Sequence, residues 1–223
     1  MSVQLAKHQL KAIEELRNGT ILNGGVGSGK SRTALAYFYQ KVCGGTLRIN
    51  GEGNFGKVPN PRDIYIITTA KKRDQSEWEA EAAPFGISRE RSNSVEGIQL
   101  KVDSWNNIAS YTDVKNAFFI LDEQRLVGLG AWGKAFLKIA KQNQWIMLSA
   151  TPGDAWMDYL PIFLANGFYR NKTEFTDNHV IWKRFSKFPQ IERYYNTDVL
   201  HHYRDRLIVD MPLERHTTRF IQN

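Results

Sequence analysis

A glycine-rich segment near the N-terminus combines residue types that bind phosphate. Residues 24–31 read Gly-Gly-Val-Gly-Ser-Gly-Lys-Ser, which fits the spacing G-x-x-x-x-G-K-[ST]. Glycines let successive backbone N–H groups converge on an anion, and a helix start adds partial positive charge. The expected nucleotide-binding residues are Gly25, Val26, Gly27, Ser28, Gly29, Lys30 and Ser31. Among them, Lys30 is the expected catalytic cation at the β- and γ-phosphates of ATP, and Ser31 the expected Mg²⁺ ligand.

An acidic pair directly follows the apolar run 117–121. A buried strand that ends in Asp122 and Glu123 places both carboxylates at the edge of the sheet where ligands bind in open α/β folds. Asp122 is therefore a candidate for holding Mg²⁺, and Glu123 for orienting and deprotonating the attacking water. Acidic turn residues after an apolar strand are common, so this interpretation depends on the phosphate-binding segment.

Gln9 lies fifteen residues before Gly24, within an expected helix over 6–17. A glutamine amide can pair with the N6/N7 edge of adenine and so select ATP. Taken alone, a glutamine on a helix is more simply explained as a solvated residue.

Short apolar runs alternate with helix-like segments along the first two thirds of the chain. This alternation predicts an α/β fold with a mainly parallel central sheet flanked by helices. Strands are expected at 20–22, 64–67, 98–102, 117–121 and 145–148, and helices at 6–17, 30–42, 74–83, 104–110 and 131–142.

The rhythm of strands and helices stops after Pro152, and aromatic residues become frequent. We expect an ATP-binding lobe over 1–155 and an α-helical, aromatic-rich extension over 156–223. Phe185, Tyr194 and Tyr195, beside Lys183, Arg184 and Arg193, could stack on the bases of a single strand. Core packing is the favoured use of these aromatic rings.

The composition is that of a soluble protein with a basic balance. Among 223 residues, 30 Lys and Arg against 23 Asp and Glu give a net charge of +7, which favours polyanionic partners such as nucleic acid. The single cysteine, Cys43, excludes an intramolecular disulfide. The start of the chain is polar and apolar runs are short, so we expect no signal peptide, no membrane contact and a cytoplasmic location.

Three further segments sharpen the prediction of function. Leu-Ser-Ala-Thr-Pro closes the last expected strand at 148–152, Thr-Thr-Ala-Lys occupies 68–71, and Val-Asp-Ser-Trp occupies 102–105. Together with Gln9, the glycine-rich loop and Asp122–Glu123, their order resembles the first RecA-like lobe of superfamily 2 DNA helicases and translocases. The DEAD/DEAH-type, Swi/Snf-like branch is the most similar, including the compact helicases of bacteriophages.

That resemblance implies roles for individual residues. It assigns Gln9 to adenine, the glycine-rich loop to ATP, and Asp122 and Glu123 to the catalytic carboxylates. By the same resemblance, the residues that couple the nucleotide to nucleic acid are Gln124, Ser149 and Thr151, and those that contact the nucleic-acid backbone are Thr69, Lys71 and Ser104. The implied partner is double-stranded DNA bound without sequence preference. Each contact residue could instead be a helix cap or a surface group.

Two departures from the family pattern affect this expectation. The family usually has Asp-Glu-Ala-His or Asp-Glu-Ala-Asp where this chain has Asp122-Glu123-Gln124-Arg125. In the family, ATP lies between two lobes and the second lobe supplies an arginine finger. We see no such second repeat in the 223 residues.

We therefore expect the ATP-binding lobe of a helicase or translocase, in a bacterial or phage-infected cell. It would be a weak or inactive ATP hydrolase until a second lobe joins it in cis or in trans. The alternatives are a non-helicase P-loop ATPase and a non-catalytic module that binds nucleic acid or regulates a partner.

Overall fold

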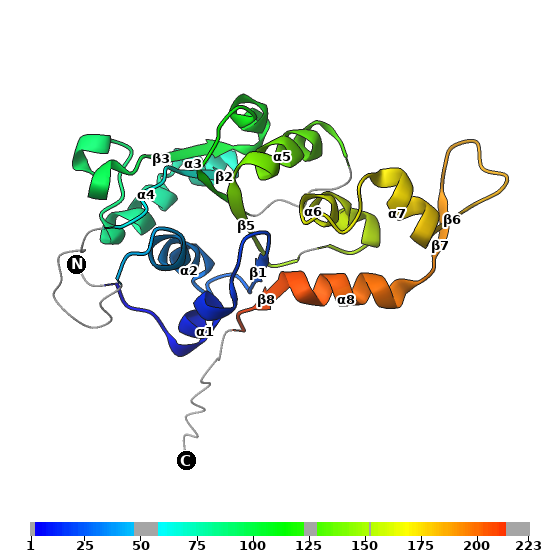
Figure 1. Ribbon diagram of the computed structural model, residues 1–223, viewed down its shortest axis with the longest axis horizontal. Helices are drawn as coiled ribbons and strands as arrows, with labels where there is room; N and C mark the ends of the chain where they lie inside the picture. Colours follow the sequence, from blue (N-terminus) through cyan, green and yellow to red (C-terminus); the bar gives the residue numbers. More distant parts are fainter. Residues whose placement is uncertain (1–2, 47–57, 123–128, 152, 213–223) are drawn as a thin grey trace, which may run out of the picture.

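The computed structural model describes residues 3–46, 58–122, 129–151 and 153–212. Its centre is a six-stranded sheet with the order β3-β2-β4-β5-β1-β8, in which every pair of neighbours is parallel (Figure 1). The strands are β1 (Ile21–Asn23), β2 (Ile64–Thr68), β3 (Leu100–Ser104), β4 (Phe118–Asp122), β5 (Gln144–Ser149) and β8 (Ile208–Asp210). Because the strands are parallel, all their carboxyl ends lie along one edge of the sheet.

Helices cover both faces of the sheet (Figure 1). The helices are α1 (Lys7–Glu15), α2 (Lys30–Tyr37), α3 (Ala70–Asp74), α4 (Glu77–Ala82), α5 (Ala131–Gln142), α6 (Leu160–Ala165), α7 (Lys172–His179) and α8 (Thr197–Leu207). A π-helical turn over Phe38–Val42 continues α2, and a 3₁₀ turn over Trp105–Tyr111 follows β3.

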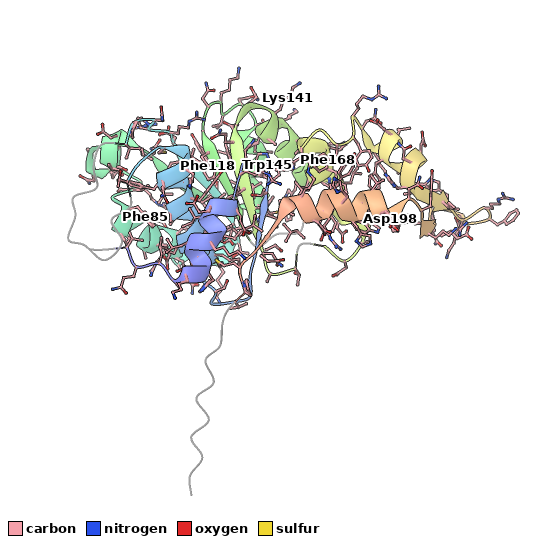
Figure 2. All side chains as sticks on the ribbon, turned by 60° about the horizontal axis from the view of Figure 1, so that its bottom comes forward. Phe85, Phe118, Lys141, Trp145, Phe168 and Asp198 are labelled. Atoms are coloured by element: carbon pink, nitrogen blue, oxygen red, sulfur yellow. The ribbon has the colours of Figure 1, made fainter. Side chains whose placement is uncertain are left out.

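The central strand β4 shows how one sequence run serves two cores. All five of its residues are buried, and alternate side chains point to opposite faces. Phe118 and Ile120 join a core under α1, α2 and α4, whereas Phe119 and Leu121 join a core under α5 and α6. Figure 2 labels Phe118 and, from the neighbouring strand β5, Trp145 inside this part of the molecule.

The predicted α/β class, with a mainly parallel central sheet flanked by helices, is confirmed. The expected helix over 131–142 has those bounds in the structure. The expected helix over 74–83 is interrupted, because Ser76 has a φ of 53° and separates α3 from α4. The expected helix over 104–110 is a 3₁₀ turn.

The C-terminal segment contains the expected helices but is mixed rather than purely helical. Between α7 and α8 lies an antiparallel hairpin of β6 (Val180–Trp182) and β7 (Ile191–Tyr194). After α8 the chain returns to the main sheet as β8, which pairs with β1. The division at residue 155 stays a prediction, but the sheet takes its last strand from beyond that position.

An aromatic cluster joins α6, α7 and α8 to the sheet. Phe163 is fully buried and lies within 6.3 Å, ring centre to ring centre, of Phe168, Tyr169, Phe175 and Tyr203. These rings belong to the same core as Phe119 and Trp145 of the sheet. The helices α6, α7 and α8 therefore pack on one face of the sheet. In the residues that the structure describes, no helix is long and apolar enough to cross a membrane.

Candidate nucleotide-binding site

The glycine-rich loop connects the end of β1 to the start of α2, as the sequence predicts. Gly27 and Gly29 have φ angles of 77° and 82°, in the left-handed region that side chains disfavour. A Cβ on Gly29 would also lie 2.4 Å from Nε2 of Gln9. Glycine at position 29 is therefore required both by the backbone turn and by the close approach of α1.

Hydrogen bonds join the loop to strand β5 and to the side chain of Lys30. The N–H of Gly24 donates to the carbonyl of Ser149 at 3.1 Å. The Lys30 ammonium donates to the carbonyls of Gly24 at 2.6 Å and Gly25 at 2.9 Å. The loop is thus closed around the Lys30 amine, which is the cation expected at the phosphates.

Ser28 supplies a polar atom that suits an anion. Its Oγ is buried and has no hydrogen-bond partner within the described part of the chain, although burying an unpaired hydroxyl is costly. A Cβ on Gly24 would lie only 2.7 Å from this Oγ, so the glycine keeps the space beside it open. A hydroxyl that lacks an acceptor, next to an ammonium and a helix start, fits a phosphate group.

Gln9 lies against this loop, where its predicted role requires it. Its Nε2 donates to the carbonyl of Gly29 at 3.3 Å, and its Oε1 accepts from the N–H of Ala6 at 2.7 Å. A primary amide has a second N–H and a second lone pair, and adenine recognition would use these. Next to it, Nε2 of His8 lies 3.3 Å from the carbonyl of Ser28, a contact that the sequence did not indicate.

Asp122 ends β4 as predicted, and the structure shows what surrounds its carboxylate. The residue is 1% exposed. Its Oδ2 accepts from the Thr68 hydroxyl at 2.8 Å, the Lys72 ammonium at 3.1 Å and the Trp78 indole N–H at 3.2 Å. The Lys72 cation compensates a buried charge, which would otherwise be costly. A metal ion at Asp122 would have to share this carboxylate with Lys72.

Strand register places Asp122 and the loop on the same edge of the sheet. Asp122 and Leu22 are both paired with Leu148 of β5, so they lie at one level. Two strand spacings separate them, which is about 10 Å between backbones. The glycine-rich loop begins two residues after Leu22.

The residues present fit Mg²⁺ only together with a phosphate. No group of three or more His, Cys, Asp or Glu that could hold a metal occurs in the described ranges. Mg²⁺ is commonly held by one or two protein oxygens, phosphate oxygens and water. Ser31 in the first turn of α2 and Asp122 suit that pattern.

The remaining predicted catalytic and coupling residues are partly accounted for. Glu123 and Gln124 lie outside the described residues. Ser149 joins β5 to the loop, because its carbonyl accepts from Gly24 and its Oγ accepts from the N–H of Thr151 at 3.0 Å. Ser149 is buried and Thr151 is exposed.

The candidate nucleic-acid contacts lie where β2 and β3 end. Thr69 caps α3, since its Oγ1 accepts from the N–H of Lys72 at 3.3 Å. Ser104 is buried, and its Oγ accepts from the Arg73 guanidinium at 3.4 Å. Thr69 and Ser104 therefore have structural roles, while Lys71 is exposed at this edge.

Asp103 organises the polar surface at the end of β3. Burial raises the pKa of its carboxyl group, but hydrogen bonds from Tyr111, Asn107, the N–H of Ser104 and Arg73 outweigh that effect and lower it. The ionised carboxylate holds the Arg73 guanidinium at 3.2 Å. The Arg73 guanidinium is thus fixed at the end of β3, two positions along the chain from the exposed Lys71.

The last described residues contact the residue that precedes the glycine-rich loop. The sequence did not predict this contact. The N–H of Met211 donates to the carbonyl of Asn23 at 2.7 Å, and the Asn23 amide donates to Asp210 at 2.7 Å. The Met211 side chain is fully buried and accepts from the Thr33 hydroxyl of α2 at 3.3 Å. The β-branched pair Ile208-Val209 is the sequence signal that favours a strand here.

Comparisons with known proteins give one coarse similarity. No protein-family model and no curated protein sequence matches the chain. A solved structure described as the helicase domain of Pyrococcus furiosus Hef is similar, with 11% sequence identity and a TM-score of 0.46. The alignment covers 79% of this chain and 40% of that one, so the chain spans less than half of the structure that it resembles. This similarity concerns the fold alone.

Proposed function

We propose that this chain is the ATP-binding lobe of an ATP-dependent DNA helicase or translocase. The observation that carries the proposal is the shared edge of the sheet. There, a glycine loop with positive φ angles, an unpaired buried hydroxyl at Ser28 and the ammonium of Lys30 follow β1 at the same edge of the sheet at which the buried carboxylate of Asp122 ends β4. These are the chemical groups that a magnesium-bound triphosphate needs.

Each residue has a specific task in this proposal. The Lys30 ammonium and the loop N–H groups bind the phosphates, and Ser31 and Asp122 hold the metal. When bound, Mg²⁺ neutralises charge on the phosphate oxygens. Lys72, Thr68 and Trp78 fix the Asp122 carboxylate before the nucleotide arrives, so little reorganisation is needed. Glu123 orients the attacking water and accepts its proton.

Nucleic acid is proposed to bind along the ends of β2 and β3. Lys71 is exposed there, Asp103 holds the Arg73 guanidinium at the end of β3, and the whole chain has a net charge of +7. Cations at strand ends contact phosphates and read no sequence. The hydrogen bond from Gly24 to the Ser149 carbonyl connects the nucleotide loop to the strand that lies beside β4. Coupling between the two ligands would pass through this strand.

The family resemblance also implies a second lobe, in cis or in trans, that supplies an arginine finger. Such a finger is worth about 10³–10⁵ in rate. We therefore propose that efficient hydrolysis requires this lobe.

Phosphate release with and without duplex DNA tests the proposal, using a form of the protein that includes the second lobe. DNA should raise the rate, and Glu123→Gln should depress it by orders of magnitude while ATP binding remains. A hydrolysis rate that is the same with and without DNA would favour a P-loop ATPase that is not a helicase. Tight ATP and DNA binding with no turnover under any of these conditions would favour a non-catalytic module.

A further inference from the structure

The hairpin of β6 and β7 projects from the ends of α7 and α8, away from the six-stranded sheet (Figure 1). Its strands pair Val180 with Tyr194 and Ile181 with Arg193, and the register shifts between Ile181 and Trp182. A bulge of this kind bends the strand and changes the direction of the side chains beyond it. Figure 2 shows that the loop carries its side chains beyond the rest of the molecule.

Aromatic rings at the tip are exposed. The expectation of core packing is wrong for Phe185, whereas Tyr194 at the base of the hairpin packs against the core. Phe185 is 101% exposed and Phe188 is 68% exposed, and Trp182 at the end of β6 is 38% exposed. By contrast, Phe163, Phe168 and Tyr169 of the same C-terminal segment pack in the core. Two phenylalanines within four residues are thus accessible to a ligand.

Positive charge surrounds these rings. Lys183, Arg184, Lys187 and Arg193 outnumber the one acidic residue of the hairpin, Glu192. Lys183, Arg184, Phe185 and Arg193, together with Glu192, help to line an open groove of about 770 Å³, and Phe188 lies outside this lining. The Lys187 ammonium lies 5.9 Å from the centre of the Phe188 ring. The surface therefore combines cations with aromatic faces.

The hairpin is held in place although its tip is exposed. The N–H of Lys183 donates to the Gln190 carbonyl at 2.9 Å, and the Ser186 hydroxyl donates to the Phe188 carbonyl at 2.6 Å. At its base, the N–H of Tyr195 donates to the His179 carbonyl at 3.0 Å. A preformed surface has less conformational entropy to lose when it binds a ligand.

We propose that this hairpin is a binding site for single-stranded nucleic acid. Phe185 and Phe188 stack on neighbouring bases, and Lys183, Arg184 and Arg193 contact the phosphates between them. Unpaired bases offer free aromatic faces, whereas duplex bases are already stacked and paired, so single strands bind better here. The proposal rests on the proposed function, since it names the site for a separated strand, but the two can be tested apart.

Binding of a fluorescein-labelled 20-nucleotide oligothymidine to the full chain tests the site. Fluorescence anisotropy should show that Phe185→Ala with Phe188→Ala weakens binding at least fivefold. Each lost stacking contact is worth about 5- to 160-fold in affinity. Binding of a labelled duplex should change less than twofold. Phe185→Trp should retain affinity for the single strand, because the larger ring still stacks.

Matched controls separate stacking from other effects. Val199→Ala removes an apolar side chain that is 42% exposed on α8 and should leave both affinities unchanged. Replacing Lys183 and Arg184 by Gln should reduce the slope of log affinity against log salt, by about 0.7 for each lost phosphate contact. Thermal unfolding of every variant should match the parent, since the tip contributes nothing to either core.

Several outcomes would overturn the hairpin site. Unchanged oligothymidine affinity in the double alanine variant would do so, as would equal losses for single strand and duplex. The chain could also bind phosphatidylserine–phosphatidylcholine vesicles more tightly than oligothymidine, in a way that depends on Phe185. That result would assign the tip to membrane binding instead. If the parent chain binds duplex DNA and ATP, and the double variant binds oligothymidine as tightly as the parent does, the hairpin site is refuted and the proposed function is not. If instead the chain binds no ATP, and the double variant loses single-strand binding, the proposed function is refuted and the hairpin site is not.

Discussion

The carboxyl edge of the sheet and the tip of the hairpin present charge in opposite ways. At the edge, the Asp122 carboxylate is buried and accepts three hydrogen bonds on a single oxygen. At the tip, Phe185 is fully exposed, and Lys183, Arg184 and Arg193 help to line an open groove. The parallel strands thus fix a few groups in place, as the proposed nucleotide site requires, while the hairpin has the open surface that the proposed single-strand site requires.

The largest expected effect is at Asp122. Asp122→Ala removes the buried acceptor that the Lys72 ammonium, the Thr68 hydroxyl and the Trp78 indole N–H share, so we expect a loss of about 3–5 kcal/mol in the free energy of unfolding. Urea denaturation measures it, with Asp113→Ala on the surface turn before β4 as control. A loss below about 1 kcal/mol would mean that the carboxylate is not held as the structure indicates.

The next effect tests whether the C-terminal strand belongs to the sheet. Met211→Ala removes a fully buried side chain beside the nucleotide loop, which should cost about 2–5 kcal/mol. Because Met211 also contacts Thr33 of α2, nucleotide affinity should fall as well. The exposed control Val199→Ala should change the free energy of unfolding by less than about 0.5 kcal/mol. Equal small effects at both positions would contradict the packing of β8 against β1.

A smaller, pH-dependent effect is expected at the base of the hairpin. Burial lowers the pKa of His179 below its ordinary 6.5, which outweighs backbone hydrogen bonds that raise it. The unfolded state therefore takes up the proton first as the pH falls below 6.5, so stability is lost on acidification and is fully present above that pH. Unfolding at pH 7.5 and 5.5 should show a smaller acid loss in His179→Gln than in the parent. An identical acid loss would exclude this histidine as its source.

The smallest expected effect is on the stability of the tip variant. Phe185→Ala should shift the free energy of unfolding by less than about 0.5 kcal/mol, because the ring makes no core contact. Thermal denaturation followed by circular dichroism is sufficient. A destabilisation above about 1 kcal/mol would show that the ring packs against the body in solution.

Elements with strong local signals were predictable from the sequence. The run 117–121 is apolar at every position, which only a strand or helix buried on both sides tolerates, and β4 is that strand. The spacing of glycines before Lys30 similarly predicted a turn between a strand and a helix, and the structure has one.

Features that depend on tertiary contacts were not predictable. The strand β8 has three residues directly after α8, and its β-branched pair favours a strand but does not indicate the pairing with β1. The contact between Lys72 and Asp122 joins residues fifty positions apart, which no local spacing encodes. The sequence also does not distinguish the exposed Phe185 from the buried Phe175, because the same residue type serves both uses.

The most direct test of the central claim is a calorimetric titration of the chain with a non-hydrolysable ATP analogue and Mg²⁺. Lys30→Ala removes the ammonium at the phosphates, so its affinity should fall by about 30-fold or more relative to the parent. The Phe185→Ala and Phe188→Ala double variant should bind as the parent does. Unchanged affinity in Lys30→Ala would contradict the assignment of the carboxyl edge of the sheet as a nucleotide site.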